Sequence, residues 1–363
     1  MGVRTENPLA PRGFAIPSLN GVRALAVAIV FFGHGFGVPG AFPGHLGVTI
    51  FFFLSGYLIT TLLRREFARS GRISLKAFYL RRVLRIVPPA YLAILFAIIL
   101  GLTGVLTARM SVWGILSEFL YYTNYYIAYS GVASLPPETS MLWSLAIEEH
   151  FYLIIPGLLL VAFNIDWGRR RIGLVLLGFA IAITIWRIYL LADGADFYRL
   201  YVSTDTRMDS MLFGSAMALL SNPALGDATP QWRKFNFGSR YFALAATAAI
   251  VIVAFIPVRS IRFSLADTLI AACLYVIFWF IISSPDGVAG RLLNCRVVAH
   301  IGVLSYSIYL FHRLMLGLSG EWFGRSVLAN LSALVMTILV AQVIYIAVER
   351  PSANLRRRLE GKG

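Results

Sequence analysis

Long apolar runs, each containing few charged residues, recur along the whole length of the chain. A helix needs about 17–25 mostly apolar residues to cross the hydrocarbon core of a bilayer. Membrane-spanning strands would instead alternate apolar and polar positions with a period of two, and these runs lack that pattern. The sequence therefore predicts an all-α polytopic membrane protein, a single domain over 1–363, with about ten transmembrane helices. Their approximate bounds are 19–38, 46–63, 86–106, 141–163, 172–192, 206–221, 241–257, 264–283, 297–317 and 327–348.

Residues 110–128 form one further apolar stretch, which is rich in aromatic residues but interrupted by Glu118 and Asn124. Loops that face the cytoplasm carry an excess of Lys and Arg. With ten spans and a cytoplasmic N-terminus, 23 of the 32 Lys and Arg residues lie in inner segments and 6 in outer segments, with Arg207 counted at the outer end of span 206–221. An eleventh span would move Arg169–Arg171 and the basic tail 349–363 outside. We therefore predict that 110–128 is an interfacial or re-entrant element and that both termini are cytoplasmic.

The composition agrees with a membrane protein. Charged residues make up 13% of the chain, against about 25% in soluble proteins. The net charge of +15 follows from the basic inner loops, so lipid bilayer is the expected partner and nucleic acid is not. The first run, 19–38, is interpreted as a retained span because it contains Arg23 and His34 and no small-residue cleavage site follows it. Cys273 and Cys295 predict neither a disulfide framework nor a metal site.

Ionisable residues inside the spans need a physical reason, since each costs about 2.5–3.5 kcal/mol at the centre of a bilayer. Arg23 and His34 both lie in the first run, eleven residues apart. This spacing corresponds to about 20° around a helix and about 16 Å along it. The two side chains are therefore expected on one face at two depths. The structural alternatives are an interhelical hydrogen bond for His34 and a snorkelling side chain for Arg23.

Five of the predicted spans contribute ionisable side chains to the outer half of the membrane, which suggests a water-accessible chamber with chemistry in it. Glu148 and Glu149 are adjacent and point about 100° apart, so they cannot both face the same neighbour. Asp205 and Asp209 lie one turn apart around Arg207, and an ion-paired helix start is their structural alternative. The predicted layer comprises His34, Glu148, Arg187, Asp205, Arg207, Asp209 and His312.

On the cytoplasmic side, a basic cluster stands at the predicted start of the third span. It contains Arg81, Arg82 and Arg85. Because Arg82 and Arg85 are one helical turn apart, they can grip one phosphate group together. The structural alternative is that these arginines only anchor the helix on the cytoplasmic side.

Seven motifs, in order along nearly the whole chain, match a known family. No single motif is specific, but together they resemble the acyltransferase-3 family of bacterial membrane O-acyltransferases. One departure is His150, where glutamine is the usual residue. The motifs are Arg23 with His34, Phe51–Ile59, Arg81–Ile86, Leu142–Leu145 with Glu148–Tyr152, Arg207–Asp209, Ser305–Ser307 with His312, and Glu349–Pro351.

The resemblance implies an enzyme of the bacterial cytoplasmic (inner) membrane that uses acyl-CoA, usually acetyl-CoA, as donor substrate. The acceptor would be a hydroxyl group of a carbohydrate or another natural product. No permanently bound cofactor and no metal is implied. Some members carry a hydrolase-like domain after the membrane domain, whereas a stand-alone enzyme is expected here. The sequence does not identify the acceptor, and it leaves the oligomeric state open.

The resemblance and the residue pattern suggest the same roles. His34 would be the general base for the acceptor hydroxyl, with a transient acyl-histidine as the alternative. Glu148 would orient His34 or balance its charge, and Arg23 would position the thioester arm or support its helix. The CoA phosphates would be bound by Arg81, Arg82 and Arg85. The acceptor chamber or its support would comprise Ser55, Arg187, Asp205, Arg207, Asp209, Tyr309 and His312.

Two rival functions fit a polytopic protein with buried charges. A transporter of a small polar solute or a lipid-linked sugar would also place charges inside the membrane. Transporters usually consist of two repeated halves, and no such repeat is evident in this sequence. A non-catalytic membrane scaffold would leave the cost of the buried histidine and carboxylates unexplained.

Overall fold

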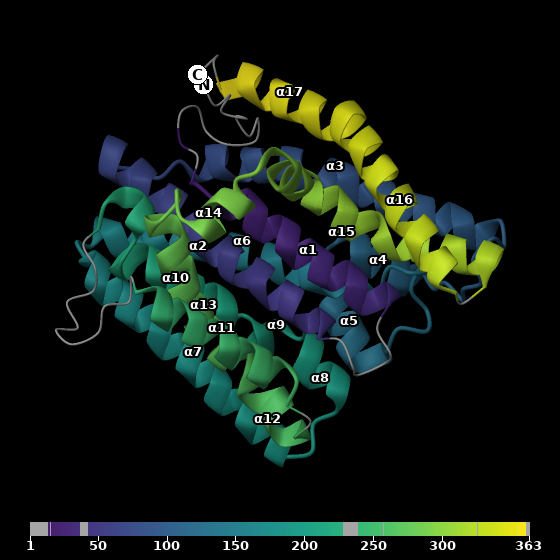
Figure 1. Ribbon diagram of the computed structural model, residues 1–363, viewed down its shortest axis with the longest axis horizontal. Helices are drawn as coiled ribbons and strands as arrows, with labels where there is room; N and C mark the ends of the chain where they lie inside the picture. The colour runs from purple at the N-terminus through teal and green to yellow at the C-terminus, as the bar shows by residue number, and fades with distance from the viewer. Residues whose placement is uncertain are drawn as a thin grey trace.

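The computed structural model describes residues 14, 16–36, 43–227, 239–256, 258–324 and 326–360, and within these ranges every regular element is a helix (Figure 1). The chain is thus an all-α membrane protein. Several sequence predictions lie outside the described residues. They are the position of both termini, the end of the first run at Val38, and the inner or outer placement of Arg4, Arg12, Arg233, Lys234, Arg325 and Lys362.

In the described ranges, ten longer helices form the bundle. Seven of the described helices are long and apolar enough to cross a membrane: α2, α3, α6, α7, α13, α15 and α16. In this count α6 includes the helical turn before it, and α16 includes the helical segment that continues from it to Leu359. Helices α1, α10 and α11 are shorter, so ten spans remains a prediction. The bounds are α1 Leu19–Gly35, α2 Gly44–Ser70, α3 Leu75–Leu102, α6 Trp143–Asn164, α7 Arg169–Ala192, α10 Asp209–Leu220, α11 Arg240–Ala254, α13 Ala266–Ser283, α15 Arg296–Phe323 and α16 Val327–Ile344.

Helix α3 begins earlier than the hydropathy pattern predicts. The Ser74 side chain accepts a hydrogen bond from the Ala77 amide and caps the helix, which therefore starts at Leu75. The apolar pattern marks only the part of a helix that lies in lipid, and here the helix extends beyond that part. The prediction that Arg82 and Arg85 stand at a helix start is therefore wrong. Both lie inside a 28-residue helix, still one turn apart.

The stretch 110–128 is covered by two short helices, α4 Val112–Phe119 and α5 Thr123–Ser130, the second of which ends two residues beyond it. Each has eight residues and rises about 12 Å, which is well short of the roughly 30 Å hydrocarbon core. Between them Tyr121 has a φ of 55°, so the chain turns there instead of continuing as one helix. Neither helix can cross a bilayer by itself.

Glycines allow two pairs of central helices, α2 with α10 and α1 with α15, to approach very closely. A Cβ at Gly56 of α2 would collide with the Met211 carbonyl of α10, and one at Gly214 would collide with the Phe53 carbonyl. Gly302 of α15 is pressed against the Asn20 backbone of α1 in the same way. Small residues permit this kind of contact between membrane helices. As a result α1 lies between α2 and α15 near the middle of the bundle (Figure 1).

Besides α4 and α5, six further short elements connect the bundle in the part of the chain that the structure describes. They are η1 Ser140–Leu142, α8 Phe197–Val202, α9 Thr204–Arg207, η2 Pro223–Leu225, α12 Arg259–Ser264 and α14 Val288–Leu293. Helix α16 continues through a π-helical turn, η3 Tyr345–Glu349, into α17 Arg350–Glu360. Pro351 follows this turn and has no amide hydrogen to donate, a common cause of such irregularities. The turn buries Glu349, which accepts a 2.5 Å hydrogen bond from Ser307.

The predicted orientation can be measured by cysteine labelling in intact cells. We expect an impermeant thiol reagent to label a cysteine at Ala133 and not one at Arg170, in a variant without Cys273 and Cys295. Ala133 is exposed, whereas its neighbour Ser134 bonds to Tyr126 and is a poorer site. Labelling at position 170, or at both positions, would require the topology to be redrawn.

Candidate active site

Five helices enclose a cavity of about 90 Å³ that three arginines line. Arg23 comes from α1, and Arg82 and Arg85 come from α3. Glu148 and Tyr152 of α6 lie on the same cavity, together with further residues of α2, α6 and α15 that include Ser55, Ser144, Tyr306 and Tyr309. We call this cavity the arginine chamber.

The arginine chamber has an excess of positive charge. The Tyr152 hydroxyl donates a 2.6 Å hydrogen bond to Glu148 and lies 3.1 Å from the Ser55 hydroxyl. The Arg82 guanidinium lies 4.2 Å from the centre of the Tyr152 ring. No hydrogen bond or ion pair joins Arg23, Arg82 or Arg85 to any described residue. Three guanidinium groups thus face a cavity whose described lining contains one carboxylate, Glu148.

Arg81 does not belong to this chamber. Its guanidinium pairs with Glu66 at 3.3 Å, and it lies by a small cleft with Glu349 and Arg356. Adjacent helical residues point about 100° apart, so Arg81 and Arg82 necessarily face different neighbours. Of the three arginines predicted to bind phosphate, Arg82 and Arg85 line the arginine chamber with Arg23, and Arg81 does not. Phosphate binding by Arg81, Arg82 and Arg85 stays a prediction.

A second and larger cavity of about 600 Å³ contains the predicted base. His34 lies on its wall and is exposed. The rest of the described wall is rich in aromatic and basic residues and also contains aliphatic residues and one carboxylate, Asp267. The aromatic and basic residues are His45, Trp143, Phe197, Tyr198, Tyr201, Arg207, Arg262, Phe263, Tyr309 and Arg313. We call this cavity the histidine chamber. Arg23 and His34 thus occupy two different cavities along one helix, as their eleven-residue spacing suggests.

The partner of His34 is a second histidine. His34 Nδ1 and His312 Nε2 are 2.9 Å apart, and His312 Nδ1 is 2.6 Å from the Tyr309 carbonyl oxygen. A carbonyl can only accept, so His312 carries its proton on Nδ1 and offers a lone pair at Nε2. His34 must then donate from Nδ1. This leaves the lone pair of His34 on Nε2, where a base is needed.

Glu148 is not the partner of His34. The prediction from topology that both residues lie in one layer is therefore wrong. Tyr309 and Ser144 form a 2.6 Å hydrogen bond that joins α15 to α6 at one level. From this level His312 is one turn along α15 towards the histidine chamber, and Glu148 is one turn along α6 towards the arginine chamber. These opposite steps amount to about 10 Å along the bundle. The sequence analysis assigned Glu148 and His312 only to the outer half of the membrane, which does not distinguish two depths about 10 Å apart.

Most of the other charged residues of the predicted layer also lie outside the chamber that contains His34. Arg187 is fully buried and donates to Asp209 Oδ2 at 3.0 Å and to the Thr206 and Ser264 carbonyls. Asp205 instead pairs with Arg199 at 2.5 Å, away from both chambers. Of the predicted set on α9 and α10, only Arg207 lines a chamber.

Asp267 was not among the predicted site residues, although it forms an ion pair with Arg207 and accepts a 2.8 Å hydrogen bond from Thr49. Asp267 could have been recognised from the sequence, because it is a carboxylate inside the predicted span 264–283. His45 and Tyr152 were also given no role, and both line a chamber. Within the part of the chain that the structure describes, no group of His, Cys, Asp and Glu could hold a metal ion.

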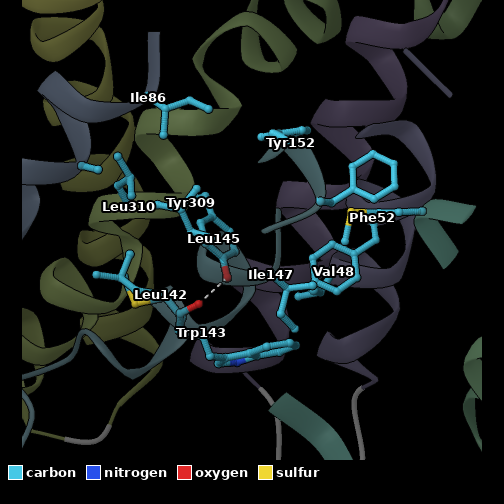
Figure 2. Packing of buried hydrophobic residues seen from close by; sticks show 14 of the residues in the cluster. Val48, Phe52, Ile86, Leu142, Trp143, Leu145, Ile147, Tyr152, Tyr309 and Leu310 are labelled. Atoms are coloured by element: carbon cyan, nitrogen blue, oxygen red, sulfur yellow. Dashed lines mark hydrogen bonds between the residues drawn. The ribbon is translucent and has the colours of Figure 1, made fainter. Parts of the chain in front are cut away.

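Tyr309 and Val48 border both chambers. The Tyr309 hydroxyl bonds to Ser144 and donates a 2.8 Å hydrogen bond to the Met141 carbonyl. Figure 2 shows Tyr309 beside Leu145, with Tyr152 of the arginine chamber on one side and Trp143 of the histidine chamber on the other. A thin layer of side chains therefore separates the two cavities.

Comparison with known proteins places this chain among acyltransferases. A family model described as an acyltransferase domain matches residues 16–346. The peptidoglycan O-acetyltransferase of Listeria monocytogenes is 31% identical over 306 residues, which cover 82% of this chain and 49% of that protein. A putative peptidoglycan O-acetyltransferase of Bacillus subtilis is 30% identical, covering 93% of this chain and 54% of that protein. A putative O-acetyltransferase of Staphylococcus aureus is 28% identical, with coverage of 93% and 57%.

The chain spans about half the length of these curated relatives. No solved structure matches it.

Proposed function

This chain belongs to the acyltransferase family whose domain model covers residues 16–346, and on that premise we propose that it is a membrane O-acyltransferase. It transfers an acyl group, with acetyl expected, from acyl-CoA to a hydroxyl group of a glycan. The relatives are named for O-acetyl transfer to peptidoglycan, which supports this reaction and a carbohydrate acceptor. The observation that carries the proposal is a pair of chambers, one cationic and one with a histidine base, that meet at Tyr309.

The arginine chamber is the proposed donor site. CoA carries several phosphate charges, and guanidinium groups bind phosphate through short charge-assisted hydrogen bonds. Arg23, Arg82 and Arg85 have no hydrogen-bond or ion-pair partner among the described residues, so their nitrogens can make such bonds. Glu148 holds Tyr152, on whose ring Arg82 stacks. Glu148 is thus proposed to position the donor arginines and not His34.

The histidine chamber is the proposed site of chemistry. The His34 Nε2 lone pair takes the proton of the acceptor hydroxyl, whose oxygen attacks the thioester carbonyl. The CoA thiolate leaves and receives that proton from His34, so that an ester and free CoA are formed. His312 and the Tyr309 carbonyl fix the His34 tautomer throughout, a role that carboxylates fill in other histidine bases.

The donor arm reaches His34 by passing Tyr309. Arg23 and His34 are about 16 Å apart along α1, so the phosphates and the thioester can occupy the two chambers at once. With the basic loop between α2 and α3 in the cytoplasm, the donor enters from the inside and the acceptor chamber opens at the other end. The enzyme is accordingly proposed to act in the bacterial cytoplasmic membrane.

Replacing Arg82 and Arg85 together by alanine is expected to lower acyl-CoA affinity at least tenfold. Each charge-assisted hydrogen bond to phosphate contributes about 1.5–3 kcal/mol. Titration calorimetry on the purified protein measures this directly. Arg81→Ala is the matched control, because Arg81 pairs with Glu66 outside the chamber and should leave the affinity unchanged. Unchanged CoA affinity in the double variant would mean that these arginines only anchor the helix.

The proposed activity itself is tested by mass spectrometry of surface glycans and small metabolites from a deletion strain. We expect one acylated species to lose its acyl mass and to regain it when the intact gene is restored. Transfer from radiolabelled acetyl-CoA by the protein in nanodiscs then identifies the donor. If no acylated species changes and no label is transferred, the proposed function is wrong.

A further inference from the structure

One corner of the histidine chamber carries basic groups that the proposed chemistry does not use. His45 comes from the first turn of α2, Arg207 from α9 and Arg262 from α12, and all three line the chamber. Arg207 and Arg262 are the charges that act on both His45 and Tyr201, so the groups lie around the same part of the wall. We call His45, Arg207 and Arg262 the cationic corner.

Two buried polar atoms of this corner have no partner among the described residues. They are His45 Nε2 and Arg207 Nε. Arg207 is only 2% exposed and its other nitrogens pair with Asp267 and Thr49. Buried polar atoms are normally hydrogen-bonded, because leaving one unsatisfied costs about 1–3 kcal/mol. Two such atoms on one cavity wall therefore indicate a ligand that supplies the missing partners.

The charges around the chamber indicate the sign of that ligand. Arg207 is neutralised by Asp267, and Arg313 pairs with Glu138 at 2.6 Å. Arg262 has no carboxylate partner in the described ranges, so its charge is not compensated. The Arg207 guanidinium also lies over the rings of Trp143 and Tyr201, with its central carbon 5.8 and 5.4 Å from their centres. A positive, aromatic-lined corner suits a sugar that bears a negative charge.

We propose that the cationic corner binds an anionic group, a carboxylate or a phosphate, carried by the acceptor glycan. This inference rests on the proposed function, because it takes the histidine chamber as the acceptor site. It makes Arg262 a specificity residue that selects charged over neutral sugars. Arg207 stays in place through Asp267 and presents its free Nε to the same group.

Direct binding tests this without requiring turnover. The protein, in phosphatidylcholine nanodiscs that contain no anionic lipid, is titrated calorimetrically with two matched sugar pairs. The methyl glycosides of N-acetylmuramic acid and N-acetylglucosamine differ by one carboxylate-bearing ether, and glucose 6-phosphate differs from glucose by a phosphate. We expect the charged member of at least one pair to bind on the order of tenfold more tightly. The pair that shows the preference distinguishes carboxylate from phosphate.

Variants of Arg262 test whether the preference for the charged sugar arises in the cationic corner. Arg262→Gln should reduce the affinity for the charged sugar to that for its neutral partner, and Arg262→Lys should retain part of it. Arg109→Gln is the control, since Arg109 is exposed and does not line the chamber. The proposal is overturned if the two sugars of each pair bind equally, or if neither charged sugar binds. It is also overturned if the preference for the charged sugar survives Arg262→Gln. Loss of the preference for the charged sugar when phosphatidylglycerol is added would also overturn the proposal, because the cationic corner would then be a lipid site. Label transfer from acetyl-CoA to a neutral glycan in the same preparation would leave the proposed function standing.

Discussion

His34→Ala is expected to abolish acyl transfer while leaving the protein folded and inserted in the membrane. His34 is exposed on the chamber wall, and its Nε2 is the lone pair that the His312 hydrogen bond leaves available. General base catalysis contributes about 10²–10⁴-fold to rate, so transfer should fall by at least two orders of magnitude. Acetyl-CoA affinity should stay within twofold of the wild type, because the donor arginines lie in the other chamber.

The measurement is transfer of label from acetyl-CoA by equal amounts of purified protein. His300→Ala is the control, since this exposed histidine of α15 hydrogen-bonds only to Gln342 among the described residues and lines neither chamber. His312→Ala should cause a smaller loss than His34→Ala, because it removes tautomer control and leaves the base. Substantial transfer by well-expressed His34→Ala protein would rule out the general-base role.

Arg187→Met is expected to destabilise the fold more than any of the other substitutions proposed above. Arg187 and Asp209 are both almost completely buried, and the substitution leaves the Asp209 carboxylate with hydrogen bonds, among the described residues, from only the Thr268 hydroxyl and the Ser210 amide. Removing one partner of a buried ion pair costs about 3–5 kcal/mol. Thermal unfolding of the purified protein in one detergent should show a lower midpoint than the wild type.

The matched control is Arg199→Met, which breaks the more exposed pair with Asp205. Exposed pairs contribute about 0–1 kcal/mol, so this variant should unfold close to the wild type. A double variant, Arg187→Met with Asp209→Leu, should recover much of the loss because no charge is then left unpaired. Equal midpoints for Arg187→Met and Arg199→Met would mean that the buried pair does not hold α7 and α10 together.

Properties of single helices could be predicted from the sequence. The apolar runs identify the bundle helices, because hydropathy along one segment depends only on that segment. The same is true of Arg23 and His34, whose eleven-residue spacing gives their relative depth from helix geometry alone. The separate directions of Arg81 and Arg82 also follow from about 100° per residue, although grouping all three arginines overlooked it.

Relations between helices could not be predicted in this way. Glu148 and His34 lie on different helices, so their separation depends on the register of α6 relative to α1, which is set by packing between helices and not by the sequence of either helix alone. His312 was placed in the right layer, but its role as the partner of His34 depends on the same register. The early start of α3 reflects a Ser74 cap outside the apolar run. Hydropathy contains no information about it.

The thin layer at Tyr309 has a consequence for the cell as well as for the reaction. Two cavities that approach each other from opposite ends of a membrane protein would conduct protons and small ions if water filled both without a break. Val48 and Tyr309 border both cavities, and Phe52 and Leu145 line the arginine side of the layer. Apolar constrictions of this kind exclude water and so block ions. On the proposed mechanism, an acyl arm that passes this layer would fill the gap that it opens, so we expect the membrane potential to be maintained during turnover.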